Sequence, residues 1–438
     1  MTQSIIYTLT PGGTLRGDIR VPGDKSISHR AIMLGALAEG VTEVVGFLEG
    51  EDSINTLKCF RAMGVHIEGP EDGRVRIEGV GLKGLSKPAS QLDVGNSGTA
   101  MRLMAGILAA QPFDTEIIGD QSLTKRPMRR ITEPLALMGA KIETGEGGRP
   151  PLRIHGGQSL KGIDYRLPMA SAQVKSCLLL AGLYAEGETR VTEPAPTRDH
   201  TERMLSGFGY EVRRDGATVA ITGGGRLTGT VVDVPADISS AAFFLVGASI
   251  AEGSDLILRH VGINPTRTGV IDILRLMGAD IEVIDPREVG GEPVADLRVR
   301  SAPLKGIRIP EELVPLAIDE FPALFIAAAC AEGETVLTGA EELRVKESDR
   351  IQVMADGLLT LGIDARPTED GIIIRGGTLG GGEVVSHGDH RIAMSFAMAA
   401  LRASAPITIH GCEYVNTSFP GFAQLARQCG LKLEEQSV

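Results

Sequence analysis

The chain has 438 residues, of which 42% are hydrophobic and 23% are charged, and its formal net charge is −12. These proportions are ordinary for a globular protein and exclude a largely disordered, collagen-like or coiled-coil chain. The acidic balance argues against nucleic acid and membrane surfaces as partners. Because one hydrophobic core rarely grows beyond about 300 residues, the length predicts two domains.

The composition also predicts the character of the core. Glycine is abundant, with 56 residues, and tryptophan is absent, so we expect an aliphatic core with many tight turns. The five cysteines show no CxxC spacing and are expected to be reduced, mostly buried thiols. The first residues lack a basic segment followed by a long apolar one, and no apolar run approaches the ~20 residues that span a bilayer. We therefore expect a cytoplasmic protein.

A pattern of helix, glycine and strand recurs six times along the chain. Each copy reads as a helix that ends at a C-terminal glycine and continues into a β-rich run. The copies are spaced by 68 to 84 residues, and their glycines are Gly64, Gly139, Gly209, Gly278, Gly362 and Gly430.

A second pattern repeats in phase with the first: a strand, a short polar motif and an Ala/Leu/Met-rich helix. The motifs begin near Pro22, Val94, Pro168, Pro235, Pro315 and Ser386. Six such units predict an α/β fold in two groups of three. The positive end of a helix favours anions, so helix starts that face inward would suit an anionic ligand.

The first motif, GDKSISHR, places Lys25, Ser26 and Arg30 at a helix start. The cations could hold phosphate or carboxylate, and Ser26 could cap the helix or donate to an anion. Asp24 stands where a P-loop needs glycine, so the motif is not a P-loop. The alternative is an N-cap with two solvated cations.

The second motif, GNSGTAMR, places Asn96 and Gly98 in a small turn that would let a ligand approach the backbone. A basic segment follows, in which Arg126 precedes a proline and is the best-placed cation for a dianion. An ordinary glycine-rich turn and a solvated basic face remain the alternatives.

The third motif, PMASAQVKS, offers Ser171, Gln173 and Lys175 as donors at a helix start, and Arg198 follows in the segment TRDH. Ordinary helix capping by Ser171 is an equally good interpretation. Asp199 and His200 are expected to be helix caps.

The fifth motif, LAIDEFPA, places Asp319 and Glu320 before an apolar helix. Such carboxylates are often N-caps. The alternative is a general base, because partial burial raises the proton affinity of a carboxylate.

The run RVKESDR contains Lys346, Glu347 and Arg350. A helical spacing would put Lys346 and Arg350 on one face, although a run of charges is usually a solvated face. The sixth motif, SHGDHR, contains two histidines and Asp389, but a metal ligand set is incomplete there. Asp389 and Arg391 fit polar organisation or anion binding better.

The motifs together predict acid–base chemistry on anionic substrates. Cations lie in or after four motifs, and carboxylates lie at Asp319 and Glu347. The G-x-G-x-x-G and G-x-S-x-G patterns are absent from the expected junctions, so neither a redox cofactor nor a serine nucleophile is indicated. We expect an enzyme without cofactor or metal.

The segments PGDKSISHRA, GNSGTAMR, LTKRPM, ASAQVKS, RVKESDR and DHRIAM, in this order, closely resemble the 5-enolpyruvylshikimate-3-phosphate (EPSP) synthase family over essentially the whole chain. The resemblance implies two similar domains of three βαβαββ units each that close over a central cleft. The domains would comprise residues 21–234, and 1–20 with 235–438.

The resemblance also implies a reaction: transfer of the carboxyvinyl group of phosphoenolpyruvate to the 5-hydroxyl of shikimate 3-phosphate, with release of phosphate. It implies three catalytic residues: Asp319 as the base and a substrate contact, Glu347 as the proton carrier, and Lys25, which contacts both substrates. The remaining substrate contacts that it implies are Ser26, Arg30, Asn96, Gly98, Arg126, Ser171, Gln173, Arg198, Lys346, Arg350 and Arg391.

Three positions depart from the commonest pattern of the family: Ala172, Glu342 and Thr417. A related enolpyruvyl transferase that acts on a UDP-sugar uses a loop cysteine, and no cysteine here lies in a recognisable glycine-rich loop. A non-catalytic anion-binding or RNA-end-binding protein is disfavoured by the net charge. We expect a monomer with small-molecule substrates and without nucleic-acid or membrane partners.

Overall fold

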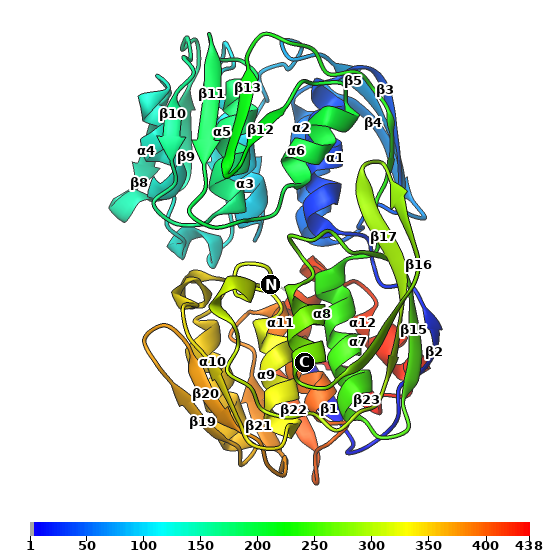
Figure 1. The fold of residues 1–438 in the computed structure, drawn as a ribbon. Helices are drawn as coiled ribbons and strands as arrows, with labels where there is room; N and C mark the ends of the chain where they lie inside the picture. The colour runs from blue at the N-terminus through cyan, green and yellow to red at the C-terminus, as the bar shows by residue number, and fades with distance from the viewer. Residues whose placement is uncertain (1–3) are drawn as a thin grey trace. The chain divides into compact units, whose positions relative to one another are not determined.

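The computed structural model describes residues 4–438, which form two compact units (Figure 1). Unit 1 consists of the chain up to Pro22, Pro235–Glu288 and Pro293–Val438, and unit 2 consists of Gly23–Val234 and Val289–Glu292. The chain therefore passes from unit 1 into unit 2 after Pro22 and returns after Val234. The family resemblance predicts these passages after residues 20 and 234.

Unit 2 contains three four-stranded sheets. In spatial order, their strands are β14 (Val231–Asp233), β3 (Glu39–Val45), β5 (Arg74–Val80) and β4 (His66–Glu71); β6 (Leu92–Asp93), β7 (Thr115–Ile118), β9 (Arg149–His155) and β8 (Lys141–Gly145); and β10 (Asp164–Arg166), β11 (Glu188–Thr192), β13 (Thr218–Thr222) and β12 (Arg213–Asp215). In each sheet the first two strands are parallel and the other neighbours are antiparallel.

Unit 1 contains three sheets built on the same plan. In spatial order, their strands are β2 (Arg16–Ile19), β15 (Asp255–Gly262), β17 (Glu292–Arg300) and β16 (Asp280–Val289); β18 (Glu334–Leu337), β20 (Ile372–Arg375) and β19 (Asp364–Pro367); and β21 (Gly382–Val385), β22 (Ile407–His410), β1 (Ile5–Leu9) and β23 (Leu433–Ser437). In the three-stranded sheet, two isolated parallel bridges at Lys305 and Arg308 take the place of a first strand.

Each sheet has one helix that begins at a polar motif and a second helix that ends at a turn glycine. The first set is α1 (Lys25–Leu37), α3 (Gly98–Leu108), α5 (Ala172–Gly182), α7 (Ile238–Ile250), α9 (Phe321–Cys330) and α11 (His390–Ala399). The second set is α2 (Glu51–Ala62), α4 (Arg129–Leu137), α6 (His200–Gly207), α8 (Gly269–Leu276), α10 (Arg350–Thr360) and α12 (Phe422–Cys429). Short 3₁₀ turns are η1 (Leu123–Lys125), η2 (Glu146–Gly148), η3 (Glu311–Leu313), η4 (Glu341–Val345) and η5 (Cys412–Thr417).

The first set of helices forms the centre of each hydrophobic core. Helix α7 is apolar on all sides and every one of its residues is buried, as expected for a helix surrounded by other elements. The helices α7, α9 and α11 pack against one another in unit 1, and in unit 2 α3 packs against both α1 and α5. Second-set helices keep exposed apolar side chains, such as Leu137 and Leu276.

The sixfold repeat and the predicted α/β class are confirmed. All six turn glycines have positive φ angles, between 82° at Gly209 and 120° at Gly430. Residues with a β-carbon rarely adopt this conformation, so glycine is the residue that lets each second-set helix end and the chain turn into a strand.

Three of the sheets are completed by a strand from a distant part of the chain. Strand β14 completes the sheet of β3, β2 completes that of β15, and β1 completes that of β22. Each of these strands is distant in sequence from the sheet that it joins. Backbone pairing requires only a free strand edge, which a distant segment can satisfy as well as a local one.

The thiol prediction is confirmed: the five cysteines are free, and four of them are buried. Burial raises the pKa of the thiols of Cys59, Cys177, Cys330 and Cys412 to about 12. Among residues 4–438, no helix is both long enough and apolar enough to cross a membrane.

Candidate active site

Five of the six first-set helices begin with a side-chain cap. Their N-terminal residues Asp24, Ser97, Ser171, Asp237 and Asp389 each accept a hydrogen bond from a backbone N–H of the first turn. The capping interpretation of Ser171 is therefore confirmed, with Val174 N as its donor at 3.3 Å. Capping orders the first turn and leaves its remaining N–H groups aligned at the helix start.

The first motif forms the start of α1. The Lys25 ammonium lies 3.0 Å from the Asp52 carboxylate of α2, and its side chain is only 17% exposed. Ser26 is partly exposed in the first turn. The solvated-cation alternative is wrong for Arg30, which is 4% exposed and donates to Thr201 Oγ1 at 2.7 Å.

Asn96 and Arg126 are held together in the second motif. Arg126 Nη2 donates to Asn96 Oδ1 at 2.8 Å, while Asn96 Nδ2 donates to Asp120 Oδ2 at 2.7 Å. Gly98 is the first residue of α3, and a β-carbon there would lie 3.1 Å from Arg126 Nη1. The turn thus places a guanidinium directly beside bare backbone, as expected for a site that binds an anion closely.

Sequence reasoning missed Arg102, which lies one turn into α3. Its guanidinium donates to Gln173 Oε1 and to Pro127 O, and Gln173 also donates to Thr99 Oγ1 at 2.9 Å. The second and third motifs are thereby linked inside unit 2. The motif GNSGTAMR contains this arginine, and its position four residues after Gly98 was the available signal.

Lys175 is not at the helix surface. Its side chain is fully buried, and its ammonium lies 2.8 Å from Glu202 and 3.0 Å from Glu193. The capping prediction also fails for His200, which is buried and hydrogen-bonded to Glu292 Oε1 at 2.7 Å. Arg198 lies just before α6 and is partly exposed.

A carboxylate cluster surrounds Arg350 in unit 1. Its guanidinium lies 3.2 Å from Asp319 Oδ1 and 2.7 Å from Glu347 Oε2, and it also binds Asp389. Burial alone would lower the pKa of Arg350, but the charges of Asp389, Glu347 and Asp319 together raise it. The guanidinium therefore stays charged and holds two partly exposed carboxylates beside each other.

Lys346 joins this cluster by a route that helical spacing did not predict. It lies in the connection before α10, not on the helix, and its ammonium is 3.4 Å from Asp319 Oδ1. Lys346 and Arg350 thus meet because both contact the same carboxylate. The interpretation of RVKESDR as a solvated face is wrong for Arg350, which is 1% exposed.

Asp389 fits the predicted polar organisation. It is fully buried and accepts hydrogen bonds from Arg350 Nε at 2.8 Å, Ser348 Oγ at 3.0 Å and Arg391 N at 3.0 Å. One carboxylate thereby connects the start of α11 with the segment that carries Glu347. The Arg391 side chain, 8% exposed, belongs to the first turn of α11.

The N-cap alternative for the fifth motif is wrong. Glu320 occupies the N-cap position of α9 without making a capping hydrogen bond, and it is buried with Ser239 and Arg267 as partners. Asp319 instead contacts Lys346 and Arg350. The geometry leaves Asp319 as the carboxylate suited to proton transfer.

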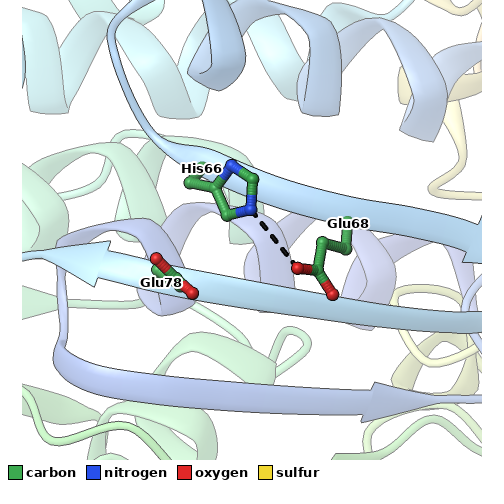
Figure 2. Close-up of side chains that lie close together, drawn as sticks. All are labelled: His66, Glu68 and Glu78. Atoms are coloured by element: carbon green, nitrogen blue, oxygen red, sulfur yellow. Dashed lines mark hydrogen bonds and ion pairs between the residues drawn. The ribbon is translucent and has the colours of Figure 1, made fainter.

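A candidate metal group lies elsewhere than the sixth motif. Among the described residues, ligand atoms of His66, Glu68 and Glu78 come within 4.8 Å of one another on β4 and β5 (Figure 2). All three are exposed, and Arg76 Nη1 already bonds Glu78 at 2.6 Å and approaches Glu68 at 3.8 Å. This group is an exposed row of charged side chains, and Arg76 already pairs with the carboxylates that a metal ion would need as ligands.

The three positions that depart from the commonest family pattern are Ala172, Glu342 and Thr417. Ala172 is the first residue of α5, and Glu342 Oε1 lies 4.0 Å from the Lys346 ammonium. Thr417 is buried, and its hydroxyl donates to Tyr414 O at 2.7 Å.

Two repeat-built α/β units, one with cations at its helix starts and one with carboxylates around a buried arginine, define a protein suited to acid–base chemistry on small anions. The family model described as EPSP synthase (3-phosphoshikimate 1-carboxyvinyltransferase) matches residues 9–425.

Relatives match over nearly the full length. The 3-phosphoshikimate 1-carboxyvinyltransferase of Methylococcus capsulatus is 72% identical, with 99% of each chain covered, and that of Alkalilimnicola ehrlichii is 71% identical, with 98% and 96% covered. A solved structure of EPSP synthase from Acinetobacter baumannii has a TM-score of 0.89 at 64% identity and covers 99% of this chain and 100% of that one. The chain belongs to the EPSP synthase family.

Proposed function

We propose that this chain is a carboxyvinyltransferase that joins phosphoenolpyruvate to the 5-hydroxyl of shikimate 3-phosphate and releases phosphate, a step of aromatic amino acid biosynthesis. Membership of the EPSP synthase family supports this function. The structural observation that carries the proposal is the placement of Asp319 and Glu347 on one buried guanidinium, that of Arg350. Two carboxylates in one cluster supply a base and an acid for the same reaction.

Asp319 acts as the base and Glu347 as the acid. Asp319 accepts the proton of the 5-hydroxyl of shikimate 3-phosphate, and the hydroxyl oxygen attacks carbon 2 of phosphoenolpyruvate. Glu347 delivers a proton to the methylene carbon. That protonation develops positive charge at carbon 2, which makes the attack possible. Glu347, now a carboxylate, then takes back a proton from the methyl group as the carbon–oxygen bond to phosphate breaks and the double bond re-forms. The phosphate leaves with the proton that Asp319 had accepted, so both carboxylates return to their starting state.

The cations bind and orient the two acids. Phosphoenolpyruvate is assigned to Lys25, Arg126, Asn96 and the bare backbone at Gly98, together with Arg350 and Arg391. The hydrogen bonds of Arg350 to Asp389, Asp319 and Glu347 leave one N–H on Nη1 for this ligand. Holding two reactants in the reacting orientation can lower the activation barrier by ~7–11 kcal/mol.

Shikimate 3-phosphate is assigned to unit 2, with Lys346 as a further contact. Its proposed contacts there are Lys25, Ser26, Arg30, Ser171, Gln173 and Arg198. The support is that these residues lie at the starts of α1, α5 and α6, or one turn inside, where backbone N–H groups and cations favour anions.

The enzyme is further proposed to act as a monomer in the cytoplasm. One chain supplies both the anion-binding and the acid–base residues, so a second copy is not required. Free thiols at all five cysteines fit a reducing compartment.

The test is phosphate release by pure protein. We expect release from phosphoenolpyruvate only when shikimate 3-phosphate is present. Release that depends on a UDP-sugar acceptor would assign the chain to the related transferase reaction, and ligand or RNA binding without any release would refute the enzyme assignment.

A further inference from the structure

Arg30 differs from the other deeply buried cations in the part of the chain that the structure describes. Lys175, Arg267 and Arg350 are at most 3% exposed, and each has carboxylates within 4.0 Å. Arg30 is 4% exposed, and its hydrogen-bond partners are neutral oxygens. The carboxylates of Asp24, Glu202 and Glu292 favour the charged guanidinium without pairing with it directly, and burial still lowers its pKa. A buried guanidinium without a directly paired carboxylate is suited to an anion brought by a ligand.

Neutral hydroxyls fix the orientation of this guanidinium. Nε donates to Thr201 Oγ1 at 2.7 Å and Nη2 donates to Ser176 Oγ at 2.9 Å. Thr201 Oγ1 in turn donates to Ser176 Oγ at 2.7 Å, so the two hydroxyls form one acceptor pair for the arginine. Nη1 donates to the backbone oxygen of Ser26 at 2.9 Å.

These contacts leave two N–H bonds of Arg30, one on each terminal nitrogen, because a guanidinium has five. Two N–H groups on one planar cation suit a carboxylate or a phosphate. The electrostatics agree: burial lowers the pKa of Arg30 to about 10, which still leaves it charged at pH 7.

Ser176 and Thr201 belong to different helices, α5 and α6, while Arg30 belongs to α1. A buried ion pair holds α5 to α6 independently, because Lys175 lies 2.8 Å from Glu202. The helices that carry Ser176 and Thr201 are therefore held together without the two hydroxyls, and loss of one hydroxyl should leave both helices in place.

We propose that Ser176 and Thr201 are positioning residues that aim Arg30 at the anionic groups of shikimate 3-phosphate. This inference rests on the proposed function, in which Arg30 binds that substrate. Neither hydroxyl needs to touch the substrate, since each acts through the guanidinium. Without Thr201 Oγ1, the buried Nε–H loses its acceptor and the guanidinium must turn to find another.

The test compares Thr201→Val with Thr201→Ser. Valine keeps the shape but removes the hydroxyl, whereas serine retains it. We expect the Kd for shikimate 3-phosphate, measured by calorimetry without phosphoenolpyruvate, to rise about tenfold or more in Thr201→Val. Thr201→Ser should bind within about threefold of the wild type, and the KM for phosphoenolpyruvate should change little in both.

Ser176→Ala provides a second variant, and Ser249→Ala is its matched control. Ser249 is a buried serine of α7 whose hydroxyl donates within its own helix, to Leu245 O. We expect weaker shikimate 3-phosphate binding in Ser176→Ala and unchanged binding in Ser249→Ala. A folded Thr201→Val protein with wild-type affinity would overturn the positioning role.

The same binding measurements distinguish failure of the proposed function from failure of the positioning role of Ser176 and Thr201. If the wild type does not bind shikimate 3-phosphate, the proposed function fails. If the wild type binds and Arg30→Met binds equally well, the role of Arg30 fails, and the positioning role fails with it. Loss of affinity in Arg30→Met and Thr201→Val, with recovery in Thr201→Ser, supports the inference.

Discussion

Arg350 and Asp389 form a bidentate ion pair that is almost entirely buried. Arg350 Nε lies 2.8 Å from Asp389 Oδ2 and Nη2 lies 3.3 Å from Oδ1, with side-chain exposures of 1% and 0%. Burial of two charges is costly, and bidentate geometry with further hydrogen bonds offsets that cost. The pair therefore holds the segment that carries Glu347 against the start of α11.

Asp389→Ala is expected to destabilise the protein by about 3–5 kcal/mol, because it leaves the Arg350 charge buried without its main partner. Denaturant unfolding measures the change. Glu334→Ala is the control: its pair with Arg366 has side chains 47% and 57% exposed, and its loss should cost no more than about 1 kcal/mol. Equal effects of the two substitutions would contradict the stabilising role of the buried pair.

Glu347→Gln is expected to slow turnover by about 10²-fold or more while both substrates still bind. Glutamine preserves the shape of the side chain but cannot deliver the proton. Steady-state kinetics and calorimetry separate the two effects. Glu341→Gln, an exposed neighbour in η4, should behave like the wild type, and a Glu347→Gln enzyme with full turnover would remove Glu347 as the acid.

Gly98→Ala is expected to raise the KM for phosphoenolpyruvate and to leave the Kd for shikimate 3-phosphate nearly unchanged. The new β-carbon would lie 3.1 Å from Arg126 Nη1 and 3.3 Å from Arg102 Nη1, so both guanidinium groups must shift. Gly207→Ala at the end of α6 meets no atom within 4 Å and serves as the control. An unchanged KM in Gly98→Ala would show that the turn does not bind phosphoenolpyruvate.

Stability is expected to fall as the pH drops below about 6.5. Burial, and then the charges of Lys25 and Arg30, hold the pKa of His29 well below its usual range. The unfolded chain binds a proton at this position that the folded chain does not. The contribution of His29 is therefore present above the unfolded pKa and lost below it, by up to ~1.4 kcal/mol per pH unit.

Urea unfolding at pH 7.0, 6.0 and 5.5 checks this expectation. His29→Gln should flatten the pH dependence, because glutamine does not titrate in this range. The same pH slope in the wild type and in His29→Gln would assign the effect to other groups.

Local chemistry explains which features could be predicted from the sequence. The helix-ending glycines, from Gly64 to Gly430, require a positive φ angle that few other residues adopt, so their spacing exposes the repeat directly. The motifs that combine a capping residue with cations at the start of a helix are equally local. Their order along the chain supports the family assignment. These features depend on residues only a few positions apart.

The contacts of the buried charges depended on the tertiary structure. Sequence spacing placed Lys346 and Arg350 on a helix face, but they meet at Asp319, which is about thirty residues away. Arg102, the hydroxyl pair beside Arg30 and the distant strands β14, β2 and β1 likewise had no local signal. The sequence by itself determined the repeat, the α/β class and the family, because turn and capping preferences act within a few residues. Only the tertiary structure decided which charges pair and which strands complete each sheet, because burial and strand pairing join segments far apart in the chain.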